Sequence, residues 1–390
     1  MSKVKRFTIF LLFFIILIMP IISALSESIK LVEADKAYVS KETVTEAGQR
    51  DTVIRFRNPK TVLTFKDTGR GNISFDTSEL GDFVIAKSLE EPLYHFAVVL
   101  DDYLMGVNHI IRGEDHISNT PRQILIQEAL GAERPLYTHL PLVLAEDRSK
   151  LSKRRHGEMV SIDFYRKEGF LPQAINNYLA LLGWNPGTAQ ELFTLQELIA
   201  AFDITKLHHA GAVFDIKKLR WINRQHLQKM TAEEFASTIS PYVAQTSLRN
   251  LSEGALARAL PVLKERVDIL SDLLTLEREG ELGYFEKVEA YPATLLIWKK
   301  SDKEAAKQHL EGVKEILEHT GDTGFTSAED IKSHLWDYAE KHGRGDVLWP
   351  LRVALSGKER SPDPFTLLSV LGKEESVARV SAAIKSLEVS

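Results

Sequence analysis

The sequence predicts an α/β fold followed by an all-helical region, and three observations support this prediction. The run 110–116 predicts a buried strand that ends in a polar loop, a helix begins after it at Thr120 and Pro121, and a second strand-like run follows at 140–144. Strand, helix and strand in this order are typical of a parallel α/β unit. Over 241–390, apolar residues recur at spacings of three and four, which indicates helices. The 390 residues suffice for about two or three domains of ordinary size.

The composition is that of an ordinary globular protein, with 44% hydrophobic and 26% charged residues. A net charge of −5 neither indicates nor excludes a nucleic-acid binder, because phosphate contacts depend on local patches of charge. The chain has no cysteine, which excludes disulfides, thiolate nucleophiles and cysteine-ligated zinc. We therefore expect no protein-bound metal.

The first thirty residues differ in kind from the rest. Lys3, Lys5 and Arg6 precede an uncharged, apolar run at 7–25. This layout is typical of a secretory signal peptide or an uncleaved membrane anchor, and Pro20 slightly favours the signal peptide. Segment 1–30 taken alone therefore predicts export or anchoring, whereas the remainder of the chain predicts the cytoplasm.

Helix and strand are both expected before the parallel unit. Residues 31–49 are expected to be helical in part. The runs 52–56 and 61–65 predict short strands, with Asn58 and Pro59 as the break between them. The apolar, β-branched run at 94–100 predicts a buried strand.

Helices are predicted from Ser161 onward. One of them ends at Gly183, a good C-terminal stop. A capping box at 326–329 precedes a helix, and Pro292 and Pro350 are expected to break the helical region. The remaining helical runs are predicted at 256–276, 305–317 and 377–387.

Polar residues follow both strands of the parallel unit. Residues 112–116 follow the first strand and 145–155 follow the second. Ligands of parallel sheets bind at the carboxyl ends of the strands, so we expect a site there. The second loop is strongly basic, with cations at 150, 153, 154 and 155. Such a loop is either a solvated basic turn or a clamp for a polyphosphate, and spacing alone does not separate the two.

The sequence KLSKR at 150–154 resembles the KMSKS signature of class I aminoacyl-tRNA synthetases, and longer matches accompany it. These are, in chain order, YHFAVVLDD at 94–102, MG at 105–106, IRGEDH at 111–116, NTPRQ at 119–123, GFLPQA at 169–174, NYL at 177–179, LGW at 182–184, VFD at 213–215, KLRWIN at 218–223, PLRVALSG at 350–357 and LGKE at 371–374. Together they resemble the bacterial glutamyl-tRNA synthetases from 31 to 390 in the family's order. The resemblance implies an ATP-dependent ligase that joins L-glutamate to tRNA(Glu) through an adenylate.

The resemblance also implies site residues. Tyr94 and Arg112 are expected to hold glutamate. Glu114 is expected to contact ATP or the tRNA end. The expected ATP-binding residues are Asp115, Leu142, Val143, Lys150, Ser152 and Lys153, with Lys153 as the catalytic cation at the phosphates of Mg²⁺-bound ATP.

Structural alternatives stand beside these roles. Plain core packing explains Tyr94, Leu142 and Val143 without a ligand. A structural ion-pair cluster explains Arg112 with Glu114 and Asp115.

The family's architecture implies a division of the chain. After the apolar segment 1–30, residues 31–92 resemble part of an inserted acceptor-binding segment, and 93–160 resemble the second half of a Rossmann-like nucleotide-binding domain. Residues 161–240 resemble the stem-contact domain, and 241–390 resemble a helical anticodon-binding domain. We expect a monomer. Phosphate contacts or a solvated helix face would each explain the cations Lys217, Lys218, Arg220 and Arg224.

The family's HIGH signature, which supplies half of the ATP site, has no counterpart in this sequence. Three interpretations follow: a truncated reading of an ordinary synthetase, a non-catalytic protein that keeps its tRNA-binding surfaces, or an exported or anchored protein with a synthetase-derived body. The first explains the intact later motifs most simply. In each case we expect the chain as it stands not to aminoacylate tRNA, because electrostatic preorganisation is usually the largest catalytic contribution.

Overall fold

The computed structural model describes residues 34–41, 52–88, 90–299 and 301–389. The predicted signal-like segment 1–30 lies outside these residues. Within them, no helix is both long and apolar enough to cross a membrane. The chain divides into two compact units, each of which is treated by itself. Of the described residues, the first comprises those up to Leu151 together with Leu179–Gln190 and Gln196–Phe214, and the second comprises Ser152–Tyr178, Glu191–Leu195 and those from Asp215 onward.

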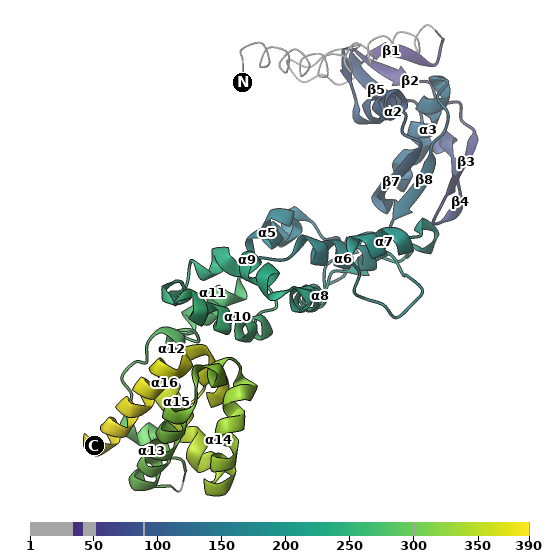
Figure 1. The fold of residues 1–390 in the computed structure, drawn as a ribbon. Helices are drawn as coiled ribbons and strands as arrows, with labels where there is room; N and C mark the ends of the chain where they lie inside the picture. The colour runs from purple at the N-terminus through teal and green to yellow at the C-terminus, as the bar shows by residue number, and fades with distance from the viewer. Residues whose placement is uncertain (1–33, 42–51, 89, 300, 390) are drawn as a thin grey trace, which may run out of the picture. The chain divides into compact units, whose positions relative to one another are not determined.

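The first unit contains three sheets, and Figure 1 labels the strands β1 to β5, β7 and β8. A mixed sheet has the order β4-β3-β8-β7, an antiparallel sheet has the order β1-β2-β5-β6, and β9 pairs with β10 in parallel. The strands are β1 Ala37–Lys41, β2 Thr52–Phe56, β3 Val62–Asp67, β4 Gly71–Asp76, β5 Phe83–Ser88, β6 Glu91–Pro92, β7 His109–Gly113, β8 Leu136–Leu140, β9 Val143–Leu144 and β10 Ala212–Val213.

The predicted parallel α/β unit is confirmed. Strands β7 and β8 pair in parallel from His109 opposite Leu136 to Gly113 opposite Leu140. Helix α3, Thr120–Ala129, connects them and has Pro121 in its first turn, where the missing N–H is not needed. The buried face of α3 completes a core with residues of the neighbouring strands and of α2, among them Phe65, Phe96, Leu100, Ile124 and Tyr137.

The predicted buried strand at 94–100 is wrong, because this run forms helix α2, Tyr94–Leu104. Its buried residues Phe96, Val99 and Leu100 lie three and four positions apart, so they share one helical face. In a strand, Phe96 and Val99 would point to opposite faces.

Two other expectations need correction. Residues 37–41, expected to belong to a partly helical region, form strand β1 in the antiparallel sheet. The strand expected at 140–144 lies earlier, as β8, and only Val143 and Leu144 form a second, short strand. Pro141 separates the two, because proline lacks the N–H that a continuous ladder requires.

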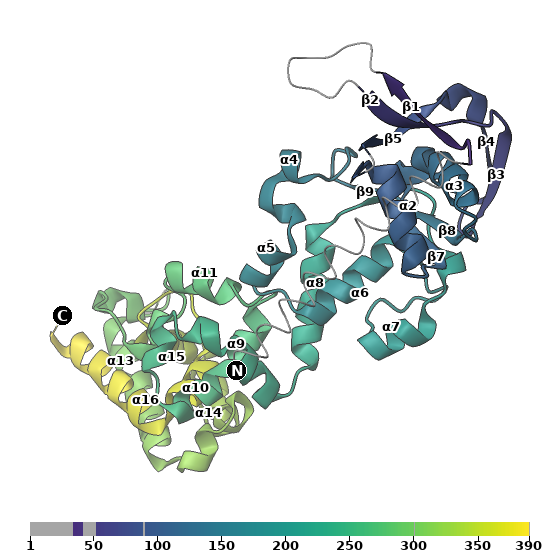
Figure 2. The ribbon, with the colours of Figure 1, turned by 90° about the horizontal axis from the view of Figure 1, so that it is seen from above.

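The chain from Ser161 onward is largely helical, as predicted. The α-helices beyond α3 are α4 Lys153–His156, α5 Ile162–Lys167, α6 Pro172–Gly183, α7 Leu195–Ala201, α8 Ile216–Lys229, α9 Ala232–Val243, α10 Glu253–Arg266, α11 Asp272–Arg278, α12 Gly283–Glu286, α13 Lys303–His319, α14 Ala328–His342, α15 Arg344–Ser356 and α16 Pro364–Val389. The short 3-10 helices are η1 Thr77–Leu80, η2 Glu114–Asn119, η3 Gly157–Val160, η4 Ile204–Lys206, η5 Ser247–Asn250, η6 Ala293–Leu296 and η7 Asp322–Phe325. Helices α13 to α16 pack against one another at the C-terminal end of the second unit (Figure 2).

Details of the helical region differ from prediction. The run 256–276 is two helices, α10 and α11, rather than one. Pro350 lies inside α15 and does not break it, whereas Pro292 precedes η6. The cap of α14 is Ser327, whose Oγ accepts from the N–H of Asp330 at 3.1 Å, one position later than predicted.

Candidate functional site

Arg112 lies on β7, and its guanidinium is fixed by side chains of α3 and β8. Its Nη1 donates to Gln123 Oε1 at 2.7 Å, and its Nη2 donates to Thr120 Oγ1 at 2.8 Å. Its Nε donates to His139 Nε2 at 3.3 Å. Burial lowers the pKa of Arg112 from its ordinary value, although arginine remains protonated in proteins. Within the described part of the chain, these contacts take three of its five N–H groups, so two remain for a planar anion such as a carboxylate.

Tyr94 is the first residue of α2 and presents its ring at the surface, with 54% of the residue exposed. The ring centroid lies 5.5 Å from that of His95 and 6.3 Å from that of His116. Among the described residues, Tyr94 makes no hydrogen bond or ring contact with Arg112. Core packing does not explain Tyr94, because the residue is exposed. Its role toward glutamate stays a prediction.

The two acidic residues of η2 have different partners. Glu114 accepts from Arg70 through Oε2 and from the N–H of Leu142 through Oε1 at 3.1 Å. Asp115 accepts from Lys150 Nζ at 2.6 Å, and this lysine lowers the pKa of Asp115 below its ordinary value. Neither carboxylate is paired with Arg112 in the structure, so the predicted ion-pair cluster of these three residues is wrong.

Leu142 and Val143 lie at the start of the short parallel sheet. The N–H of Leu142 donates to Glu114, and its carbonyl accepts from the N–H of Ala212 at 3.1 Å. Both backbone polar groups of Leu142 are therefore used within the protein. Val143 lines an apolar pocket of about 250 Å³ in the first unit, together with Ile111 and other apolar residues. Packing and contact with a flat apolar group are both compatible with this position.

The basic loop begins as a tight turn and continues into the one-turn helix α4. The N–H of Ala145 donates to the carbonyl of Ser149 at 2.8 Å, and Leu144 bridges to Lys150. Ser152 precedes α4 in an extended conformation, and its N–H donates to His156 Nδ1 at 3.1 Å. Lys153 is exposed and, within the described ranges, makes no ion pair. Lys150 belongs to the first compact unit, whereas Ser152 and Lys153 belong to the second.

A buried pair that was not predicted from the sequence supports Arg112. The side chains of Asp67 and His139 are both 0% exposed, and His139 Nδ1 lies 2.7 Å from Asp67 Oδ2. Asp67 ends β3 and His139 lies in β8. Asp67 continues the alternation of Leu63 and Phe65 in β3, and this was the available indication that its side chain faces the core.

The basic residues of α8 are largely engaged by carboxylates of the second unit. Arg220 Nη2 lies 2.7 Å from Asp272 Oδ2, and Arg224 Nη1 lies 3.3 Å from Asp268 Oδ1. Lys218 pairs with Glu191 at 2.6 Å. These contacts favour a structural role for the three cations over a row of phosphate contacts.

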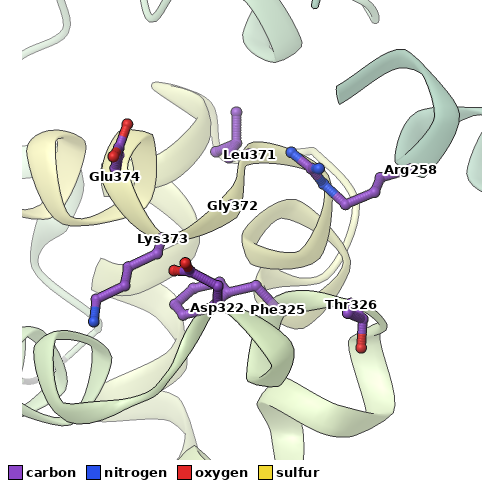
Figure 3. A pocket seen from close by; sticks show the side chains of 8 residues that line it. All are labelled: Arg258, Asp322, Phe325, Thr326, Leu371, Gly372, Lys373 and Glu374. Carbon is purple, nitrogen blue, oxygen red and sulfur yellow. The ribbon is translucent and has the colours of Figure 1, made fainter. Parts of the chain in front are cut away.

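The LGKE motif lines a pocket with a volume of about 300 Å³. Figure 3 shows the side chains that line it. Gly372, at φ 76°, interrupts α16 there, and Arg258 Nε and Nη2 donate to the carbonyl of Val370 at 3.2 and 3.1 Å. Lys373 Nζ donates to the carbonyl of Glu318 at 2.7 Å, near the end of α13. Arg258 of α10 therefore supplies donors to a carbonyl next to the kink in α16, and Lys373 binds a carbonyl in the last turn of α13.

Comparison with known proteins gives two family matches and several similar chains. Residues 26–221 match the family described as tRNA synthetases class I (E and Q), catalytic domain, and residues 234–384 match the anticodon binding domain family. The glutamate--tRNA ligase 2 of Halorhodospira halophila is 40% identical over 340 residues, covering 85% of this chain and 69% of that protein. The glutamate--tRNA ligase of Clostridium kluyveri is 36% identical over 357 residues, covering 90% and 71%. A crystal structure of a glutamate tRNA ligase from Elizabethkingia meningosepticum, in complex with its amino acid, matches with a TM-score of 0.72 and 30% identity, covering 93% of this chain and 71% of that one.

Proposed function

We infer the function from one premise: this chain belongs to the glutamyl-tRNA synthetase family of class I tRNA synthetases. The family's reaction has two steps. The α-carboxylate of L-glutamate attacks the α-phosphorus of ATP and pyrophosphate leaves. A ribose hydroxyl at the end of tRNA(Glu) then attacks the acyl carbon of the adenylate, and AMP leaves. We propose that this chain carries the glutamate-holding and phosphate-holding residues of such a site.

The observation that carries this proposal is the arrangement of Arg112. Its guanidinium is oriented by Gln123, Thr120 and His139, while two N–H groups remain for a ligand. A planar fork of this kind matches a carboxylate in two-point contact. Tyr94 offers an exposed ring at the start of α2. We assign Arg112 and Tyr94 to L-glutamate.

The proposed ATP side uses the basic loop and the loop before it. Lys153 supplies the charge for the phosphates, supported by Lys150 and Ser152, and the exposed setting of Lys153 leaves its ammonium accessible. Asp115 orients Lys150 through their ion pair. Leu142 and Val143 face the adenine, for which the apolar pocket beside Val143 offers a surface. Glu114 holds the backbone of Leu142 and contacts ATP or the tRNA end, and ATP enters as its Mg²⁺ complex.

We propose that the domains predicted from the sequence contact different parts of the substrates. The acceptor end of tRNA contacts 31–92, the nucleotide and glutamate contact 93–160, the tRNA stem contacts 161–240 and the anticodon contacts 241–390. We also propose that the protein acts as a monomer in the cytoplasm.

We further propose that these 390 residues do not form the adenylate by themselves. They contain no HIGH-like sequence, so the donors that this signature supplies are missing from the chain. Positioning and charge stabilisation are each worth several kcal/mol, so losing half of both brings the rate close to background. The test is glutamate-dependent ATP–pyrophosphate exchange by the purified full chain, with tRNA(Glu) present. We expect no exchange above a reaction without enzyme, and clear exchange would overturn this part of the proposal.

Binding of tRNA without turnover is the second candidate, and the match of 234–384 to an anticodon binding domain favours it. Phosphate contacts are distributed over many side chains, so they survive the loss of one segment. We expect the chain to bind tRNA(Glu) in a filter assay, and affinity should fall steeply between low and physiological salt. Equal affinity at both salt concentrations would contradict a phosphate-dominated interface.

A further inference from the structure

The carboxylate of Asp67 is held by four donors in the core of the first unit. Its Oδ1 accepts from the N–H groups of Gly69 at 3.0 Å and Arg70 at 2.9 Å. Its Oδ2 accepts from the backbone N–H of His139 at 3.0 Å and from the ring Nδ1 of His139 at 2.7 Å. Asp67 is thus an acceptor at a fixed position, and the His139 ring is anchored to it at two points.

The other nitrogen of His139 faces Arg112. Its Nε2 lies 3.3 Å from Arg112 Nε and 3.2 Å from Thr120 Oγ1. An arginine N–H can only donate, so Nε2 must carry a lone pair, and the ring proton must lie on Nδ1 toward Asp67. Burial lowers the pKa of His139, in agreement with a neutral ring beside a guanidinium.

Thr120 of α3 also contacts the Arg112 guanidinium. Its hydroxyl accepts from Arg112 Nη2 at 2.8 Å and donates to the carbonyl of His116 at 3.1 Å. The guanidinium is therefore held in plane by an acceptor on β8 and by acceptors on α3, because Gln123 also takes one N–H. A residue that fixes this plane decides where the two remaining N–H groups point.

We propose that His139, anchored by Asp67, is a positioning residue for substrate: its unprotonated Nε2 aims the free N–H groups of Arg112 at the substrate carboxylate. The proposal rests on the assignment of Arg112 to L-glutamate. His139 does not touch the substrate and acts through Arg112 alone. Groups that face its ring are Asp67, Arg112, Thr120 and Tyr137, whose ring stacks on it at 6.1 Å.

The test compares two substitutions of His139 in the full chain. His139→Gln can place an amide oxygen where Nε2 lies and keep an acceptor for Arg112, whereas His139→Phe keeps a ring and removes the acceptor. The first measurement is the ¹⁵Nε–¹Hε NMR resonance of Arg112, identified by its loss in Arg112→Lys. We expect a slowly exchanging proton in the parent and in His139→Gln, and fast exchange in His139→Phe. An identical resonance and exchange rate in all three would overturn the proposal.

The second measurement is calorimetric titration with L-glutamate. We expect His139→Phe to weaken binding roughly tenfold, the effect of one hydrogen bond to a charged group, and His139→Gln to stay within about threefold of the parent. Equal weakening in both variants would overturn the positioning role, because a general structural defect gives that result.

Two controls keep the outcomes distinct. If the parent binds no glutamate while the Arg112 resonance responds as expected, the substrate assignment of Arg112 fails and the contact from His139 to Arg112 stands. If His139→Phe does not fold, as judged by thermal unfolding, His139→Asn replaces it, because its shorter side chain also withdraws the acceptor. Fast Arg112 exchange in His139→Asn supports the proposal, and unchanged exchange overturns it.

Discussion

The two polar regions assigned to substrates differ in how the fold holds them. Arg112 is half-buried, and three neighbouring side chains accept its hydrogen bonds. Lys153 stands exposed on the one-turn helix α4, and the described residues offer it no ion pair. The first group is oriented before a ligand arrives, whereas the second requires an anion to fix it. Substitution of Arg112 should therefore change the binding of glutamate, and substitution of Lys153 should change the rate of ATP–pyrophosphate exchange.

The largest effect is expected at Lys153, in a chimera that joins the HIGH-bearing segment of a glutamyl-tRNA synthetase to this chain. Lys153→Ala should slow ATP–pyrophosphate exchange by roughly 10²–10³-fold, the usual loss when one donor to transition-state charge is removed. Thermal stability should not change, because the residue is exposed. The matched control is Lys341→Ala, an exposed lysine of α14. An unchanged rate in Lys153→Ala would instead favour the interpretation of this loop as a solvated basic turn.

Asp67 should show the reverse pattern, with a large effect on stability. Asp67→Ala removes one partner of a buried pair and leaves the donors of Gly69, Arg70 and His139 without an acceptor. We expect a loss of about 3 kcal/mol in the free energy of unfolding, measured in urea. A loss below about 1 kcal/mol would show that the network around Arg112 is not rigid.

Substitution of Arg112 should affect the KM for glutamate. In the same chimera, Arg112→Ala should raise the KM for glutamate by about tenfold or more and leave the KM for ATP nearly unchanged. Arg112→Lys should restore little, because an ammonium cannot form the two-point contact of a guanidinium. A change in the KM for ATP alone would contradict the assignment.

The buried histidine predicts a pH dependence of stability. The folded state lowers the pKa of His139, so the unfolded chain binds more protons near and below the ordinary histidine pKa of about 6.5. The contribution of His139 to the stability of the fold is therefore complete above about pH 6.5. It is lost as the pH falls from about 6.5 toward the lower pKa of the folded state. Urea unfolding at a series of pH values should show a shallower acid loss in His139→Gln than in the parent. Parallel curves would mean that His139 titrates alike in both states.

The smallest effect is expected at Lys150, whose ion pair with Asp115 is largely solvated, with side chains 53% and 39% exposed. Lys150→Ala should change the free energy of unfolding by less than about 1 kcal/mol, and added salt should reduce the difference further. A larger, salt-insensitive change would indicate that the basic loop is held as firmly as Arg112.

The local patterns of the sequence predicted the parallel unit well. Thr120 and Pro121 mark the start of α3, and the polar residues after Gly113 mark the end of β7, because caps and strand ends have strong local preferences. Short apolar runs are harder to assign to a secondary structure, because both the helical and the strand periodicity fit them. Residues 94–100 form a helix since Phe96, Val99 and Leu100 must share the face that packs on the core.

Motifs predicted site residues only where the residues that carry the chemistry lie close together in the sequence. Arg112 and Lys153 were predicted from the resemblance, whereas Thr120 and Gln123 lay in a matching segment and were given no role at the site. The pair of Asp67 and His139 joins strands 72 positions apart, and no local pattern predicts such a contact. The carboxylates around Arg220 likewise come from a distant helix, which is why the sequence left its role open.

The most direct test of the account is the amino-acid dependence of ATP–pyrophosphate exchange in the chimera, with tRNA(Glu) present. The account predicts exchange with L-glutamate, little or none with glutamine or aspartate, and loss of glutamate-dependent exchange at low glutamate in Arg112→Ala. Exchange driven by an amino acid other than glutamate, or by glutamate equally well in Arg112→Ala, would contradict the claim that Arg112 holds the carboxylate of L-glutamate.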